Sequence, residues 1–332
     1  MQKITREVLI EKAASLLNEG VVSAVYGWKK GEFVYDVTPA LFTTTEELEK
    51  EFVWGDFCGA NFSKYLVAST RKTEGKILVF LKPCDTYSFN QLLTEHRFDR
   101  EKVYAVGIPC EGMADVSKVK AAAGEGIIAI ESTEEGLAVT TLYNDAPVVV
   151  PYAEALAERC INCKSKKHVA YDELIGEEGD VLESGRFDQV AELEAMTPDE
   201  RFAFWQNELS KCIRCNACRD VCPACTCEKC VFNNPVSGAE TKAPMGTFEE
   251  KMFHIIRAFH VAGRCTDCGD CSRVCPQDIP LHLLNRKFIK DINTHYGEYQ
   301  AGAEVGSRAP LVNYTTEDVE PCDVFERGDK NA

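Results

Sequence analysis

Cys212-Ile-Arg-Cys215-Asn-Ala-Cys218-Arg-Asp-Val-Cys222-Pro223 decides the architecture of the C-terminal part of the chain. Its spacing, C-x2-C-x2-C-x3-C-P, returns in Cys265-Thr-Asp-Cys268-Gly-Asp-Cys271-Ser-Arg-Val-Cys275-Pro276. Three thiolates from one tight turn can hold three irons of a 4Fe–4S cubane, while the fourth cysteine points away and ligates the neighbouring cluster. The two motifs therefore predict two 4Fe–4S clusters.

The predicted ligand sets cross between the motifs. The first cluster takes Cys212, Cys215, Cys218 and Cys275, and the second takes Cys265, Cys268, Cys271 and Cys222. Zinc is the alternative, and its sites are usually built from two C-x2-C pairs. A zinc site needs neither a third cysteine nor a cross-ligating C-P, so two full copies of the motif favour iron–sulfur clusters.

Composition narrows the class of protein further. The chain has 332 residues, 17 cysteines, 45% hydrophobic residues and a net charge of −16. The apolar fraction excludes a disordered chain, and the negative charge repels nucleic-acid phosphates. No apolar run reaches the ~20 residues that cross a bilayer, and the start of the chain lacks a signal-peptide core. We expect a cytoplasmic protein with no nucleic acid and no membrane insertion, whose thiols are metal ligands more than disulfides.

The N-terminal part alternates strands with helices, and this order predicts an α/β fold with a mostly parallel sheet. The clearest strands are residues 76–81 and 102–108, each followed by a helical stretch. Asp85 is the expected N-cap of the helix through Glu95. The remaining predicted elements are a helix over residues 9–17 and strands over residues 21–26, 126–130, 138–142 and 148–150.

Cys84 and Cys110 each follow the carboxyl end of a predicted strand. Open parallel sheets bind ligands along that edge, so the two thiols could face one site; they could equally be buried structural cysteines. Cys160-Ile-Asn-Cys163 is a further metal-type pair, and Lys164, Lys166 and Lys167 follow it. Nearby lysines lower thiol pKa values or offset cluster charge. Together these four cysteines predict a third cluster at the sheet edge.

Three cysteines are surplus to these sets, in Cys225-Thr-Cys227-Glu-Lys-Cys230. Three thiols within six residues suggest a further metal site, and Cys58 is the candidate fourth ligand of a fourth cluster. This assignment leaves only Cys322, in the tail.

The chain divides into an α/β domain (1–185), a helical connector (186–211), a cluster domain (212–290) and a polar, acidic tail (291–332). Thr197-Pro-Asp-Glu200 has the pattern of a helix start with a capping box. Residues 247–260 carry apolar residues at helical spacing, so a helix separates the motifs, as in the α-helical ferredoxin modules of fumarate reductase and heterodisulfide reductase subunits, which this arrangement resembles. We expect His254 and His260 to pack around that helix, although a ligand role is open for each.

The order of the motifs resembles the β subunits of coenzyme F-420-reducing hydrogenases and formate dehydrogenases, in the bacterial branch with a C-terminal dicluster domain. The resemblance covers residues 5–300 and rests on these stretches: Glu19-Gly-Val-Val-Ser23, Trp54-Gly-Asp-Phe-Cys58, Lys82-Pro-Cys-Asp85, Gly107-Ile-Pro-Cys-Glu-Gly112, Cys160-Ile-Asn-Cys163 and Cys212-Ile-Arg-Cys215-Asn-Ala-Cys218-Arg. It implies an electron-transfer subunit whose α/β part holds FAD beside a 4Fe–4S cluster. FAD stays open here, because no G-x-G-x-x-G follows a predicted strand.

Two functions remain in competition. The first is an iron–sulfur electron-transfer subunit of a multi-subunit redox complex, of the formate dehydrogenase, hydrogenase, heterodisulfide reductase-like or methylenetetrahydrofolate reductase type. The second is an FAD-containing oxidoreductase that itself reduces a deazaflavin or nicotinamide carrier. His96 and Asp85 lie near the predicted sheet-edge site, but we assign no general acid or base. In either case we expect a hetero-oligomer with other redox subunits.

Overall fold

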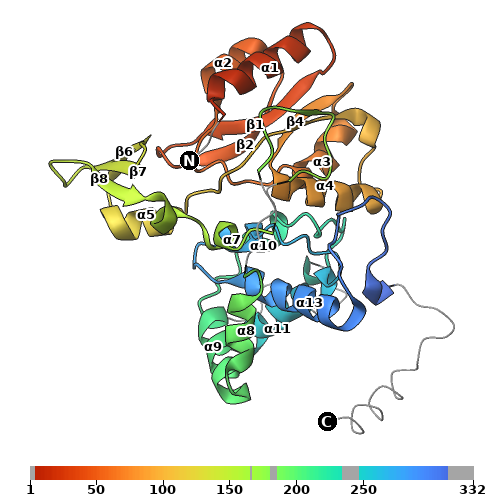
Figure 1. Cartoon of the computed structure of the whole chain (residues 1–332). Helices are drawn as coiled ribbons and strands as arrows, with labels where there is room; N and C mark the ends of the chain where they lie inside the picture. The colour runs from red at the N-terminus through yellow and green to blue at the C-terminus, as the bar shows by residue number, and fades with distance from the viewer. Residues whose placement is uncertain (1–3, 165–166, 180–184, 234–246, 313–332) are drawn as a thin grey trace.

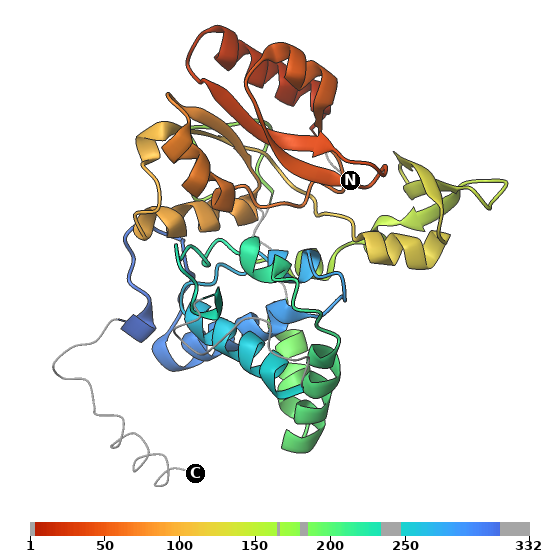
Figure 2. The same ribbon diagram turned by 180° about the vertical axis from the view of Figure 1, so that it is seen from behind.

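A computed structural model describes residues 4–164, 167–179, 185–233 and 247–312. An α/β unit forms one end of the molecule, a helical module forms the other, and a small sheet projects from the side (Figure 1). The view from behind shows the same three parts, with the helical module packed below the α/β unit (Figure 2).

The main sheet has the order β2-β1-β4-β5-β9, with β3 beside β1. Four of its strands run parallel: β1 (Ala24–Lys30), β4 (Ile77–Leu81), β5 (Val103–Gly107) and β9 (Glu173–Leu174). The other two, β2 (Val37–Phe42) and β3 (Phe52–Val53), pair antiparallel with β1. The predicted α/β fold with a mostly parallel sheet is therefore confirmed.

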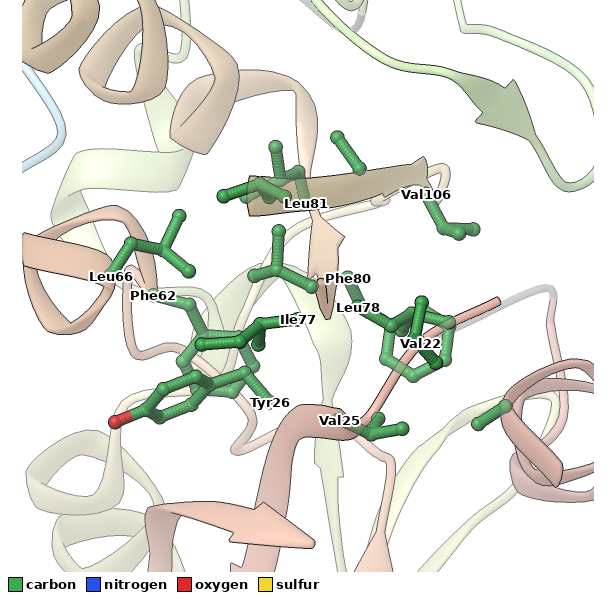
Figure 3. Close-up of a cluster of buried hydrophobic side chains, with 14 of the residues drawn as sticks. Val22, Val25, Tyr26, Phe62, Leu66, Ile77, Leu78, Phe80, Leu81 and Val106 are labelled. Atoms are coloured by element: carbon green, nitrogen blue, oxygen red, sulfur yellow. The ribbon is translucent and has the colours of Figure 1, made fainter. Parts of the chain in front are cut away.

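Helices cover both faces of this sheet. α1 (Arg6–Asn18) and α2 (Thr45–Glu51) lie on one face, and α3 (Ser63–Lys72) and α4 (Pro83–Thr94) lie on the face toward the helical module (Figures 1 and 2). Every residue of β4 is buried, as expected for a central parallel strand covered on both sides. Its side chains form the core with neighbours from β1, β5 and α3, such as Val25, Val106 and Leu66 (Figure 3).

The helix after β4 begins earlier than predicted. Asp85 is not its N-cap, because Pro83 occupies the first turn, where a missing N–H costs nothing. Lys82 becomes the N-cap residue, and its backbone N–H donates to Asp85 Oδ2 (3.2 Å). The Lys82 ammonium also lies 2.7 Å from this oxygen, with both side chains buried. The Asp85 carboxylate, in the first turn of α4, therefore stabilises the start of the helix by binding Lys82.

The projecting sheet is antiparallel and has its own core. It contains β6 (Ile127–Ser132), β7 (Gly136–Thr141) and β8 (Val148–Pro151), which confirms the three short strands predicted there. Val119 of α5 (Val116–Ala123) and Ala155 of α6 (Tyr152–Ala155) pack on its buried face. A 3-10 turn over Arg100–Lys102 precedes β5, and α7 (Glu158–Ile161) leads back toward the cysteine motifs.

The helical module is built on three longer helices, α9 (Pro198–Ser210), α11 (Thr247–Val261) and α13 (Leu281–Tyr296). The capping box of Thr197 and Glu200 is confirmed, as Thr197 N–H donates to Glu200 Oε2 (2.9 Å). The helix expected between the motifs is α11. Shorter elements complete the module: α8 (Asp188–Ala195), α10 (Ala217–Asp220), α12 (Asp270–Arg273) and 3-10 turns over Val231–Asn233 and Pro310–Val312.

After α13 the chain returns to the α/β unit. Gly306 N–H donates to Thr94 Oγ1 at the end of α4 (2.8 Å). Gly302 passes so close to α4 that a Cβ there would lie 1.8 Å from the carbonyl oxygen of Tyr87. Within the described residues, no helix combines the length and the apolar character that a membrane crossing requires.

Candidate metal centres

The two cysteine motifs adopt the same backbone. Arg214 and Asp267, at equivalent positions, have φ of 55° and 59°, and Asn216 and Gly269 have φ of 64° and 69°. Each motif then ends in a one-turn helix, α10 or α12, and these two helices pack against each other. Two left-handed residues turn the chain back on itself, which gathers the three thiols of each motif.

The first predicted ligand set lines a single cavity. Cys212, Cys215 and Cys218 of the first motif meet Cys275 of the second around an empty volume of about 330 Å³. Cys275 of the second motif therefore lies beside the three cysteines of the first, and cluster binding by these four stays a prediction. Apolar side chains close the cavity, among them Phe253, Ile279 and Leu281.

Polar groups of α11 contact these thiols. His254 Nε2 lies 3.2 Å from Cys212 Sγ, and Arg257 Nη1 donates to Cys218 Sγ (3.3 Å). Burial, reinforced by Arg257 and Arg214, lowers the pKa of His254 to about 3, so this imidazole is neutral. Neutral His254 and cationic Arg257 can both stabilise thiolate charge by hydrogen bonding. His254 and Arg257 thus contact thiol sulfurs of the first predicted ligand set without belonging to that set.

The second set lies deeper in the molecule. Burial raises the pKa of the Cys265 thiol to about 11 and that of Cys271 to about 12, and it also raises that of Cys268. The charges of Cys265 and Cys271 act on Cys268, which indicates that the three lie together. Burial lowers the pKa of the Arg257 guanidinium, but nearby thiols, among them Cys218, Cys222 and Cys271, outweigh it and raise this pKa.

Buried ion pairs hold the second motif against the α/β unit. Asp270 is fully buried; it pairs with Arg159 and with Arg273 Nε (2.8 Å) and accepts the N–H of Asn61 (2.9 Å). The two arginines hold the pKa of Asp270 well below its usual range, against the opposing effect of its burial. These contacts fix the motif to residues that are distant in sequence.

Asp267, in the same motif, forms a second set of ion pairs, with arginines other than those that pair with Asp270. It accepts from Arg186 Nε (2.8 Å) and Arg286 Nε (3.1 Å), and the two guanidiniums, with Lys164, lower its pKa although its burial acts in the opposite direction. The acidic residues of the second motif are therefore neutralised by buried cations.

The third predicted set shares one cavity at the edge of the main sheet. All four of its cysteines line an empty volume of about 540 Å³: Cys84, Cys110, Cys160 and Cys163. Cys84 and Cys110 follow β4 and β5, and α7 with its following loop carries the other two. Cys268 and Asp267 of the second motif line the same cavity, so this set adjoins the dicluster module.

Basic side chains surround the third set. Lys82, Arg159 and Lys164 line its cavity. Burial lowers the pKa of Lys164, whose ammonium donates to the carbonyl of Thr266 and lies 4.2 Å from the centre of the Tyr87 ring. For Lys82 the same burial is outweighed by Asp85 and Cys84, which raise its pKa. Such cations offset the negative charge of thiolates.

The surplus cysteines line another cavity, without Cys58. Cys225, Cys227 and Cys230 surround an empty volume of about 1,170 Å³. Cys58 lies in the core of the α/β unit, where its Sγ approaches the carbonyl of Val53 (3.8 Å) and burial raises its pKa to about 12. Cys322 and Lys166 lie outside the described residues. Within the described ranges, no three His, Cys, Asp or Glu side chains converge on a point suited to a single metal ion.

Several residues at these centres give no signal in the sequence. Arg159 and Arg257 look like ordinary surface cations, and their burial depends on contacts between distant segments. His168 is also buried at the sheet edge, with Nε2 3.0 Å from the carbonyl oxygen of Leu81. His96, singled out near the predicted site, has φ of 52° at the end of α4 and does not line the cavity of the third set.

Comparison with known families agrees with this geometry. Residues 208–279 match the family described as a 4Fe-4S dicluster domain, a segment that contains both motifs. The chain is therefore an iron–sulfur protein with a dicluster domain, and its cofactors are 4Fe–4S clusters.

Two relatives extend the comparison over most of the chain. The F420-dependent formate dehydrogenase subunit beta of Methanocaldococcus jannaschii is 24% identical over 356 residues, covering 90% of this chain and 92% of the relative. The F420-dependent formate dehydrogenase 1 subunit beta of Methanococcus maripaludis is 24% identical over 368 residues, covering 89% and 92%. The chain is thus similar to such β subunits over most of its length, in agreement with the resemblance of its motifs.

Among solved structures, a chain of the F420-reducing [NiFe] hydrogenase complex from Methanosarcina barkeri also matches. The match has 15% identity and a TM-score of 0.36, and it covers 61% of this chain and 84% of that chain.

Proposed function

We propose that this chain is an iron–sulfur electron-transfer subunit of a multi-subunit redox complex of the formate dehydrogenase or hydrogenase type. One observation carries the proposal: Cys268 of the dicluster module lines the same cavity as Cys84, Cys110, Cys160 and Cys163. Three sets of thiols thus follow one another from the helical module to the edge of the sheet. A continuous series of redox centres is what an electron relay requires.

The residues of the chain have separable roles in this relay. The cysteines of the three sets hold the clusters, and a bound 4Fe–4S cluster supplies one-electron storage and release. His254 and Arg257 hydrogen-bond thiol sulfurs of the first set. Arg159 donates to the carbonyl oxygen of Cys268 (3.1 Å) and to that of Gly59 (2.8 Å), so it joins the second motif to the α/β unit. Hydrogen bonds and buried charge of this kind set cluster potentials.

The partners that we expect are inferred from the names of the relatives. The relatives are named as subunits of formate dehydrogenases, and we infer that this chain also works beside catalytic subunits in a hetero-oligomer. Heterodisulfide reductase-like or methylenetetrahydrofolate reductase-type complexes are alternative settings for the same relay. We assign it to the cytoplasm.

Metal analysis of the anaerobically purified full chain tests the proposal. We expect at least about twelve irons with matching sulfide, since three sets hold four irons each. Cys110→Ser should lose about one to four of them, because removal of one ligand leaves a three-iron cluster or an empty site, and it should alter the magnetic coupling between the third cluster and its neighbour in EPR spectra. Cys322→Ser is the matched control and should retain all of the iron of the wild type. About eight irons in both the wild type and Cys110→Ser would remove the third set from the relay.

A groove between α5 and the second cysteine motif favours a second candidate, an FAD-containing oxidoreductase. Tyr35, Phe57, Lys118 and Arg273 line an empty volume of about 1,710 Å³ that also reaches Cys275 of the first set. Aromatic rings and cations suit a flavin nucleotide. The test measures the FAD that the chain binds after anaerobic reconstitution and its turnover of a deazaflavin or nicotinamide carrier; both should be detected if this candidate is right. Tyr35→Ala should weaken FAD binding while Tyr143→Ala does not, and equal binding by the two variants would exclude the groove.

A further inference from the structure

We propose that Cys225, Cys227, Cys230 and His260 hold a fourth 4Fe–4S cluster. The inference rests on the proposed electron-transfer function and extends the relay by one site. Three thiolates and one imidazole are all established types of iron ligand. The ligand set differs from the one that the sequence suggests, because His260 replaces Cys58.

The four side chains line one cavity. The cysteines belong to the loop that follows the first C-P motif, and His260 lies at the C-terminal end of α11. Cys58 is not among the residues that line this cavity. Its side chain is 1% exposed and packs in the core of the α/β unit. His260 therefore supplies the fourth ligand without any rearrangement of the core.

The electrostatics of the cavity suit an anionic occupant. Two carboxylates, Asp220 and Glu228, line it, and four cationic side chains outnumber them: Lys64, Arg219, Arg257 and Arg264. Arg219 is paired with Asp220 and Arg264 with Glu95, which leaves Lys64 and Arg257 as the cations nearest to the thiols. The ammonium of Lys64 donates to the carbonyl oxygen of Cys225. Arg257 is 5% exposed, and its Nε–H finds no hydrogen-bond partner among the described residues. A buried donor without a partner is costly, so this N–H is available to a sulfur of a bound cluster.

The cavity adjoins the dicluster module directly. Cys225 N–H donates to the carbonyl oxygen of Cys222, the predicted cross-ligand of the second cluster (3.0 Å). Arg257, which lines the cavity, also hydrogen-bonds Cys218 Sγ of the first set. Cys227 is exposed, so the site opens to solvent. One electron could pass between this site and the dicluster module without any bond being made or broken.

Iron analysis of a cysteine variant tests the cluster. Anaerobically purified wild-type chain should hold about sixteen irons, and Cys225→Ser combined with Cys227→Ser and Cys230→Ser should hold about twelve. EPR signals of the other three clusters should persist, which would show that the variant has folded. Equal iron content in both proteins would overturn the proposal, as would stoichiometric zinc that disappears in the variant. Cys58→Ser should retain all irons; loss of four would return Cys58 to the ligand set.

A histidine pair tests the fourth ligand. His260→Gln should lose about one iron per chain and give the signal of an oxidised three-iron cluster, whereas His260→Cys should retain all four irons of the site with altered g values. His295→Gln, an exposed histidine on α13, is the matched control and should change nothing. Identical spectra for His260→Gln and His295→Gln would reject His260 as a ligand. About twelve irons throughout would defeat only this inference, whereas fewer than about eight would defeat the proposed relay itself.

Discussion

The two cysteine motifs share one spacing and one backbone but occupy opposite environments. In the first motif, Ile213 is 52% exposed and Cys215 is exposed, with Arg214 4.2 Å from the ring of Phe253. In the second, Thr266 and Asp270 are buried against the α/β unit. Cysteine spacing therefore determines how ligands are gathered, while the residues between the cysteines determine where each loop lies in the molecule.

This difference assigns separate tasks to the two loops. The first presents its ligands near the surface, where another protein or carrier can approach. The second is a structural joint, because its carboxylates meet arginines from three other segments. Mutations at equivalent positions should therefore have unequal effects.

The largest effect is expected from Asp270→Asn. The change leaves Arg159 and Arg273 without their shared carboxylate, and breaking a buried pair costs about 3–5 kcal/mol. Asp220→Asn in the first motif is the control, since its pair with Arg219 is at the surface and is worth under about 1 kcal/mol. Urea unfolding of the anaerobic proteins, followed by circular dichroism, measures both. Equal losses would mean that the second motif is no more a joint than the first.

Gly269→Ala should come next. Its Cβ would lie 2.5 Å from Arg159 Cβ, and its φ of 69° already disfavours alanine. Overpacking adds about 1–3 kcal/mol to a left-handed cost of about 1–2 kcal/mol. Asn216→Ala, at the equivalent position of the first motif, replaces one residue that has a Cβ by another and should therefore cost less than Gly269→Ala. The same unfolding experiment compares them, and a larger loss for Asn216→Ala would reverse the comparison.

A smaller effect, on potential, is expected from His254→Phe. With its proton on Nε2, His254 donates to Cys212 Sγ and stabilises the more negative, reduced state of the first cluster. The variant should therefore lower the reduction potential of that cluster. Asn285→Leu should shift the second cluster less, because Asn285 Nδ2 lies 3.7 Å from Cys271 Sγ. EPR-monitored redox titrations measure the reduction potentials of both clusters. An unchanged potential of the first cluster in His254→Phe would contradict a hydrogen bond from His254 to that cluster's ligand.

The smallest difference concerns oxygen sensitivity of the unmodified protein. Each set contains one buried cysteine, Cys218 or Cys271, but only the first set contains an exposed one, Cys215. During brief exposure to air, the EPR signal of the first cluster should decay before that of the second. Simultaneous decay of both signals would indicate that exposure of the motif does not control access of oxygen.

Short-range patterns carried most of what the sequence predicts. The spacing alone predicts that Cys275 joins the first set, since the fourth cysteine of such a motif points away from the other three, and Cys275 does line the same cavity as those three. Cys84 and Cys110 share a cavity because the carboxyl ends of neighbouring parallel strands meet at one edge. The predicted N-cap at Asp85 was wrong: the N-cap is Lys82, three residues earlier, and Pro83 takes the first position of the helix.

Long-range contacts explain what the sequence does not reveal. Arg159 matters because α7 lies against the second motif, and no local pattern around it indicates that contact. Strands β3 and β9 have two residues each, too few for a periodic signal. His260 shares a cavity with the surplus cysteines only because α11 ends beside their loop.

The cavity of the third set has a consequence for how the protein matures. Its four cysteines are synthesised early, but the wall that contains Cys268 emerges from the ribosome only after the first motif and α11. Domains generally fold as units in the order of synthesis. This side of the cavity therefore stays open until the second motif docks, and we expect the predicted third cluster to be completed only after that step. We therefore expect this centre to assemble only in chains whose second cysteine motif has been synthesised and has folded.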